Sequence, residues 1–122
     1  MSSDGKPLPP LEIVVFARLH LSRILRWTAK DTEATYLANE ERQAAVERCF
    51  IAIGEAVQDL SRSVDLKTLD PQGPWNDAVR FRHFLAHRYN EGTSHSEVFK
   101  TVKIDLPDLD AALARVEMLL KR

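Results

Sequence analysis

The chain has 122 residues, which is enough for one domain, and its 44% hydrophobic and 29% charged residues exclude disorder of the whole chain. Its formal charge of −1 excludes the binding of long nucleic acids through a broad basic face. The single cysteine, Cys49, excludes an intrachain disulfide and fits a reducing compartment.

The first residues predict a flexible tail ahead of one domain. Residues 1–9 lack the basic start and apolar run of a signal peptide and contain two prolines, so we expect an extended segment there. Residues 10–122 are then expected to form one helical domain. The longest purely apolar run, residues 13–17, is far too short to cross a bilayer, and we expect a cytoplasmic protein.

Apolar residues recur every three to four positions along the chain, whereas no segment shows the sustained alternation of a strand. Residues 10–30 predict the first helix, and His20, which falls on its apolar stripe, is expected to pack rather than to bind a ligand. Residues 31–39 are expected to connect this helix to the next one with some helical character. The stripe consists of Ile13, Phe16, Ala17, Ile24 and Trp27.

Residues 39–61 predict a second helix with the clearest apolar seam. A line of small residues beside the seam lets another helix approach closely, either within the fold or across a dimer. Glu55 projects away from the seam, and we interpret it as a solvated carboxylate. Cys49 is expected to be a buried structural thiol. The seam consists of Val46, Cys49, Phe50, Ile53, Val57 and Leu60, and the small residues are Ala45, Cys49, Ala52 and Ala56.

Turn and capping signals predict the remaining elements. A polar loop over residues 63–73 precedes a third helix, predicted over residues 74–88 with a proline in its first turn. The Ser-His-Ser-Glu sequence that opens residues 94–102 matches a capping box and predicts a short helix. Asp105 is expected to cap the last helix. These signals predict an all-α domain of four to five helices, most simply an up-down bundle.

The end of the third helix concentrates cationic and proton-transferring side chains. Five of the nine residues from 80 to 88 are Arg or His in a chain of net charge −1, so the positive potential is local and its natural target is phosphate. On an ideal helix Arg82 and Tyr89 share a face, whereas His87 lies about 140° from Arg82. Either the helix unwinds near His87, or two copies of the segment meet across a two-fold axis.

A cleft that holds arginine and histidine suits RNA cleavage. Histidine takes the proton from a ribose 2′-hydroxyl or gives one to the leaving 5′-oxygen, and arginine stabilises charge on the phosphate. No metal or cofactor is needed when the 2′-oxygen attacks internally, and the product is a 2′,3′-cyclic phosphate. The spacing alone also fits a solvated basic helix end that the helix dipole favours.

The pattern Arg82-x4-His87-x-Tyr89 resembles the signature of the HepT-like branch of the HEPN superfamily. The Ile-Gly-Glu-Ala stretch at residues 53–56 is similar to one in that branch. The Pro-Trp pair before the motif helix and the Asp-Leu-Pro-Asp-Leu run after it also fall where the family has such residues. The resemblance covers about residues 10–120, nearly the whole chain.

The resemblance implies a HEPN-type bundle that dimerises with the motif helix at the interface. Members of this branch act as metal-independent endoribonuclease toxins in two-gene toxin–antitoxin modules. Their usual partner is an MNT-type nucleotidyltransferase antitoxin, which silences the toxin by transferring AMP to the motif tyrosine. By position, Arg82 binds phosphate, His87 is the general acid and base, and Tyr89 is the AMP acceptor.

The expected partners are therefore an RNA substrate such as tRNA or mRNA, the cognate nucleotidyltransferase antitoxin and a second copy of the chain, with no membrane, no DNA, no metal and no cofactor.

The chain departs from the family at His83, where asparagine is common, and at Arg88, where glycine is common. Neither departure removes a catalytic group. We interpret His83 as a helix-surface residue.

Two other functions fit the same residues. One is a non-catalytic HEPN dimer that acts as a scaffold or as a nucleotide-sensing partner of a nucleotidyltransferase. The other is a plain helical-bundle interaction protein. Only the ribonuclease requires His87 for RNA decay, whereas the plain bundle leaves Arg82, His87 and Tyr89 all replaceable.

Overall fold

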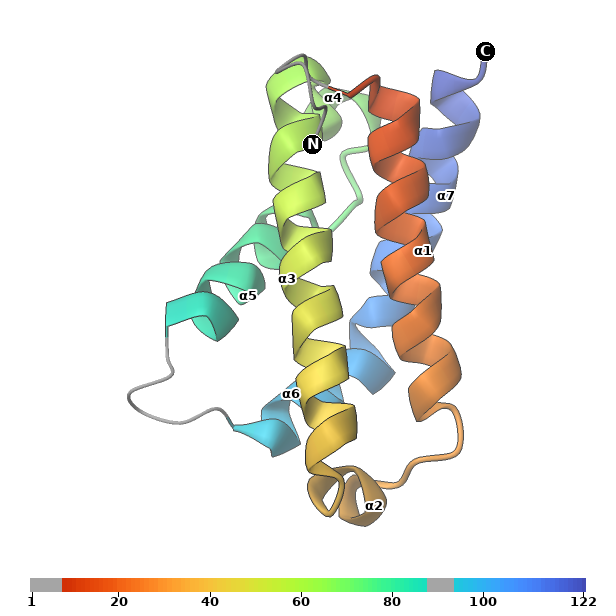
Figure 1. Cartoon of the computed structure of the whole chain (residues 1–122). Coiled ribbons are helices and arrows are strands. Elements are labelled where there is room, and N and C mark those ends of the chain that lie inside the picture. The colour runs from red at the N-terminus through yellow and green to blue at the C-terminus, as the bar shows by residue number, and fades with distance from the viewer. Residues whose placement is uncertain (1–7, 88–93) are drawn as a thin grey trace.

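The computed structural model of the protein describes residues 8–87 and 94–122, which form seven helices and no strand. The four long helices α1, α3, α5 and α7 alternate in direction, so the predicted all-α, up-down arrangement is confirmed (Figure 1). None of the described helices is long and apolar enough to cross a membrane. The helices are α1 (Pro10–Thr28), α2 (Glu33–Leu37), α3 (Glu40–Ser63), α4 (Leu66–Leu69), α5 (Trp75–His87), α6 (His95–Ile104) and α7 (Leu106–Leu120).

The described residues contain more helices than the four to five predicted, because two connections fold into short helices. At the start of α2, Thr32 and Thr35 form a capping box, with each side chain accepting the other residue's backbone N–H. Gln43 closes the far end of α2 by donating to two of its carbonyl groups at 3.1 Å. The side chain of Asp65 caps α4 by accepting the N–H of Thr68. Local side-chain caps therefore create these helices where apolar periodicity is too short to predict them.

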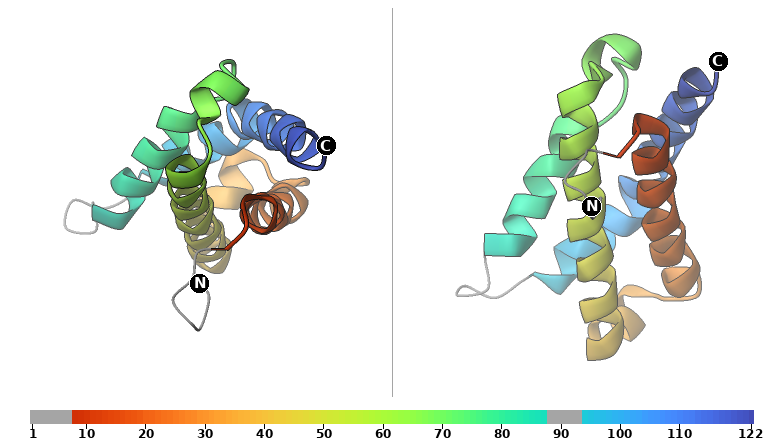
Figure 2. Two further views of the ribbon diagram at one scale, coloured as in Figure 1. Left: turned by 90° about the horizontal axis from the view of Figure 1, so that it is seen from above. Right: turned by 45° about the horizontal axis from the view of Figure 1, so that its top comes forward.

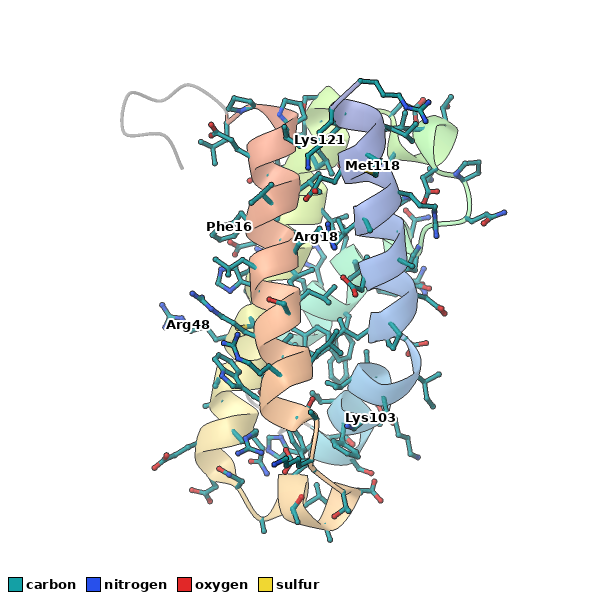
Figure 3. The ribbon with its side chains drawn as sticks, turned by 90° about the vertical axis from the view of Figure 1, so that its right-hand side faces the viewer. Phe16, Arg18, Arg48, Lys103, Met118 and Lys121 are labelled. Carbon is teal, nitrogen blue, oxygen red and sulfur yellow. The ribbon has the colours of Figure 1, made fainter. Side chains whose placement is uncertain are left out.

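The core lies between α1, α3 and α7, and the seam predicted for α3 is buried along its whole length. Cys49 belongs to this seam, and burial raises the pKa of its thiol, as expected for a structural cysteine. The stripe predicted for α1 is wrong at Phe16, which is 45% exposed, and Trp27 is only half-buried. Figure 3 shows Phe16 projecting from α1 on the same side as Arg48, away from α7.

Helix α5 lies at the edge of this core, to which it contributes Trp75 and Leu85, and within the part of the chain that the structure describes its extensive contacts are with α3. The view from above in Figure 2 places α3 between α5 and α1. Two contacts fix where α5 begins. The indole Nε1 of the buried Trp75 donates to the carbonyl of Asp70 at 2.9 Å. The carboxylate of Asp70 in turn accepts two hydrogen bonds from Arg115 of α7, at 2.8 and 3.1 Å.

Gly73 lets the indole ring of Trp75 lie over the turn that precedes α5. A Cβ atom at position 73 would lie 2.3 Å from the ring, a distance at which one of the two groups must move. The turn, the ring and the Asp70 carbonyl therefore form one packed unit that sets the direction in which α5 leaves the bundle.

We predict that Trp75→Phe lowers the free energy of unfolding by about 2 kcal/mol, because the variant loses packed ring volume and the indole hydrogen bond to the Asp70 carbonyl, which then keeps only the N–H of Gly73 as a donor. Urea unfolding measures the change. Trp27→Phe is the matched control, and because Trp27 is half-buried its cost should be clearly smaller. Equal costs for the two variants would contradict the account of the α5 start.

Candidate functional site

Arg82 lies on the side of α5 that packs against α3, directly opposite Gly54. A Cβ atom at position 54 would lie 2.2 Å from Cβ of Arg82, 2.8 Å from its Cγ and 3.1 Å from the carbonyl oxygen of Ala78. Only glycine permits so close an approach of the two helices. The aliphatic stem of Arg82 is therefore held against the backbone of α3.

The guanidinium of Arg82 emerges from this contact with its two terminal nitrogens beside polar side chains. The side chain is 21% exposed, and its Nε is buried without a hydrogen-bond partner among the described residues. Nη2 lies 3.5 Å from Oε1 of Glu55 on α3, and Nη1 lies 3.4 Å from Nδ1 of His83. The site thus holds a cation of fixed orientation at an exposed edge between α3 and α5.

Two residues of this site were given other roles by the sequence. The side chain of Glu55 is 55% exposed, as a solvated carboxylate should be, but it forms an ion pair with Arg82. His83 is exposed, as a helix-surface residue should be, but its ring contacts the same guanidinium. Their positions in the sequence could have indicated these contacts. Glu55 directly follows the glycine against which Arg82 packs, and His83 directly follows Arg82 itself.

The other two predicted site residues are described only in part. His87 is the last residue of α5, and its side chain lies outside the described residues, as do Arg88 and Tyr89 entirely. Because α5 remains helical through His87, Arg82 and His87 keep their helical separation of about 140°. Within the described residues, α5 therefore does not unwind to bring the two together. His83 stands one turn before His87.

A pocket of about 260 Å³ opens between α5 and the α6–α7 corner, and Arg82 does not line it. Its walls are apolar, with Phe81 and Leu109 among them. Three carboxylates, those of Asp77, Asp105 and Asp108, also line it. A negative rim repels phosphate, so the phosphate-binding candidate is the Arg82 edge and not this pocket.

The other described histidines belong to the packing of the bundle. Burial and the charge of Arg23 lower the pKa of His20, whose ring packs edge-on against Phe16 with ring centres 4.5 Å apart. Nδ1 of His95 lies 3.3 Å from the carboxylate of Glu47, and burial raises the pKa of that carboxyl group. In the described ranges, no group of three or more His, Cys, Asp or Glu side chains is arranged to hold a metal ion.

Comparison with known proteins gives matches over most of the chain. A family model described as "Ribonuclease HepT-like" matches residues 18–116. A protein of Thermococcus cleftensis named "Probable ribonuclease HepT" is 38% identical over 74 residues, which are 61% of this chain and 64% of that protein. The chain thus spans less than two thirds of the length of this relative.

Two proteins of Methanocaldococcus jannaschii, named "Putative RNase MJ1216" and "Putative RNase MJ0125", are each 25% identical over 97 residues, or 80% of this chain. The matched parts are 78% and 81% of those proteins. No solved structure matches the chain.

We predict that Gly54→Ala lowers the free energy of unfolding by about 1–3 kcal/mol, because the added methyl group forces α5 away from α3. The sign of this change in the free energy of unfolding is informative, because Gly→Ala inside a helix otherwise stabilises the helix by up to about 1 kcal/mol. Urea unfolding measures the change, and Ala44→Gly at an exposed position of α3 calibrates the ordinary helix effect. A stabilised Gly54→Ala protein would contradict the close approach.

Proposed function

This chain belongs to the HepT-like ribonuclease family, and from that membership we propose that it is a metal-independent endoribonuclease toxin of a toxin–antitoxin module. The observation that carries the proposal is the Arg82 guanidinium, whose stem is held against Gly54 and whose terminal nitrogens reach an exposed edge of the motif helix. The relatives named as ribonucleases support RNA as the substrate class.

The proposed reaction is an internal transfer at one phosphodiester. His87 takes the proton of the 2′-hydroxyl, the 2′-oxygen bonds to phosphorus, and the bond from phosphorus to the 5′-oxygen breaks as that oxygen receives a proton. Arg82 binds the phosphate and stabilises the charge that develops on its oxygens. The products are a 2′,3′-cyclic phosphate and a 5′-hydroxyl.

In this proposal, a second copy of the chain is needed to bring an arginine and a histidine to the same phosphate. Arg82 faces α3, and His87 stands about 140° further round α5, so one helix does not bring both side chains to one phosphate. A two-fold arrangement of motif helices places the arginine of one copy beside the histidine of the other. The exposed position of α5 on the bundle leaves this helix accessible to a partner copy (Figure 1).

Tyr89 is the proposed site of control. It lies two residues after His87, so an AMP group transferred to its hydroxyl by a cognate MNT-type nucleotidyltransferase antitoxin would add bulk and negative charge beside the proposed phosphate site. Both effects oppose the entry of RNA.

One observation favours a second candidate function. Glu55 partly neutralises the charge of Arg82 in the free protein. If the ion pair between Glu55 and Arg82 never opens, Arg82 is not available to a phosphate. The chain would then be a non-catalytic dimer that serves as a scaffold or as a nucleotide-sensing partner of the nucleotidyltransferase. The nuclease test that follows decides between the two.

We predict that the protein, expressed without its antitoxin, cleaves RNA in excess EDTA, and that Arg82→Ala and His87→Ala each lower kcat/KM by about 10²–10⁴-fold. Arg80→Ala is the matched control on α5, because its exposed side chain pairs only loosely with Asp77 at 3.8 Å, and its activity should stay within about threefold of wild type. Equal cleavage by all four proteins, or none by the wild type, would favour the scaffold.

We predict that incubation with ATP and the cognate nucleotidyltransferase raises the intact mass by one or more AMP groups and abolishes RNA cleavage. Tyr89→Phe should keep the unmodified mass and the full nuclease activity, because it lacks only the acceptor hydroxyl. Modification of the Tyr89→Phe protein to the same extent would assign the acceptor to another residue.

A further inference from the structure

A groove runs along the side of α5 that faces α6 and the start of α7. In the part of the chain that the structure describes, α5 packs extensively on α3 but not on α6 or α7, so this side of α5 stays partly uncovered. The pocket of about 260 Å³ at the α6–α7 corner adjoins a second pocket of about 340 Å³ further along α5. Because Asp77, Phe81 and Thr101 line both pockets, the two form one elongated groove.

The floor of the groove is a row of three phenylalanine rings. The ring of Phe81 meets that of Phe50 edge-on with ring centres 4.9 Å apart, and it stacks on that of Phe84 with ring centres 5.7 Å apart. Phe50 comes from the buried seam of α3, which anchors the row in the core, whereas Phe81 and Phe84 are half-buried. Such a floor suits apolar side chains and the flat face of a guanidinium, which aromatic rings attract.

The rim of the groove is strongly acidic. Among the described residues that line it, four carboxylates stand against one cation, Arg80, whose side chain is 77% exposed and lies 3.8 Å from the nearest of them. Asp105 makes no side-chain capping hydrogen bond to α7, so the helix does not use its carboxylate. The four carboxylates are those of Asp77, Glu97, Asp105 and Asp108.

We propose that this groove is a docking site for a partner protein, which lays a segment of alternating apolar and arginine side chains along α5. The apolar side chains pack on the phenylalanine rings, and the arginines stack on the same rings while they pair with the rim carboxylates. An elongated groove with an apolar floor fits a peptide segment better than a compact small molecule. RNA does not fit, because the carboxylates repel phosphate.

A partner in this groove leaves the Arg82 edge open. Arg82 lines neither pocket, and its position on α5 is about 100° from that of Phe81. Docking in the groove and phosphate binding at Arg82 therefore use different sides of one helix. The docking site goes beyond the proposed ribonuclease function and does not depend on it.

The test titrates the isotope-labelled chain with synthetic ligands and follows its backbone amide signals by NMR. The probe is an acetylated and amidated hexapeptide in which arginine alternates with leucine. The matched control peptide carries citrulline, the neutral isostere of arginine, at each arginine position. Agmatine, a free guanidinium on a short aliphatic chain, tests whether a small organic cation binds as well.

The protein variants remove charge from the rim without removing volume. Asp105→Asn combined with Asp108→Asn is the main variant, and Asp77→Asn tests the opposite side of the groove should the double variant fail to fold. Asp110→Asn is the matched control, because Asp110 lies on α7 and lines neither pocket.

We expect the arginine peptide to bind at least about tenfold more tightly than the citrulline peptide, with the largest signal changes in residues 77–84 and 97–109. The double variant should bind the arginine peptide about tenfold more weakly and Asp77→Asn about threefold more weakly, because each loses carboxylates that pair with arginine. Asp110→Asn should match wild type.

Three results would overturn the docking site. Equal affinity of the arginine and citrulline peptides, or of the double variant and Asp110→Asn for the arginine peptide, would show that the rim does not recognise a cation. Agmatine that binds as tightly as the hexapeptide would make the groove a site for a small organic cation. A changed oligomeric state of the double variant, measured by light scattering, would assign the groove to a contact between two copies of the chain.

Discussion

The contact between Gly54 and Arg82 is the constraint on which the site depends. At this point α3 and α5 approach so closely that a methyl group at position 54 would overlap the stem of Arg82. Burial of Nε adds a second restraint, so the guanidinium has little freedom to turn. An unrestrained arginine on an exposed helix samples many rotamers and must lose that entropy on binding phosphate. Here the fold has already ordered the side chain, which is the condition for effective electrostatic stabilisation.

The same contact determines what the site lacks. By holding Arg82 toward α3, it keeps the guanidinium on a different side of α5 from the position of His87. A single copy thus presents the proposed phosphate-binding group and the proposed proton-transfer group at separate edges. The packed turn around Trp75 and Asp70 fixes the direction of α5 and leaves the helix on the outside of the bundle. This placement suits a site completed by a second copy.

The long helices and the core of α3 could be predicted from the sequence, because both follow from apolar periodicity. The short helices could not, since they depend on caps such as Thr32 and on the amide of Gln43, which lies seven and six residues beyond the two carbonyls that it caps. Phe16 has the spacing of a core residue but projects from the side of α1 that faces away from α7, where it stays largely exposed (Figure 3). The side chains that contact Arg82 could not be predicted either, because the periodicity of one helix does not show which other helix packs closely against it at a glycine. Glu55 and His83 therefore looked solvated until α3 and α5 were placed together.

The central claim is that Arg82 of one copy and His87 of another act on the same phosphate. Mixing the two inactive variants, Arg82→Ala and His87→Ala, tests it most directly, with cleavage of one RNA in EDTA as the measurement. Half of the dimers formed by random exchange carry one intact pair, so the account predicts recovery of about a quarter of the wild-type activity. A mixture no more active than its separate components would contradict a site shared between two copies.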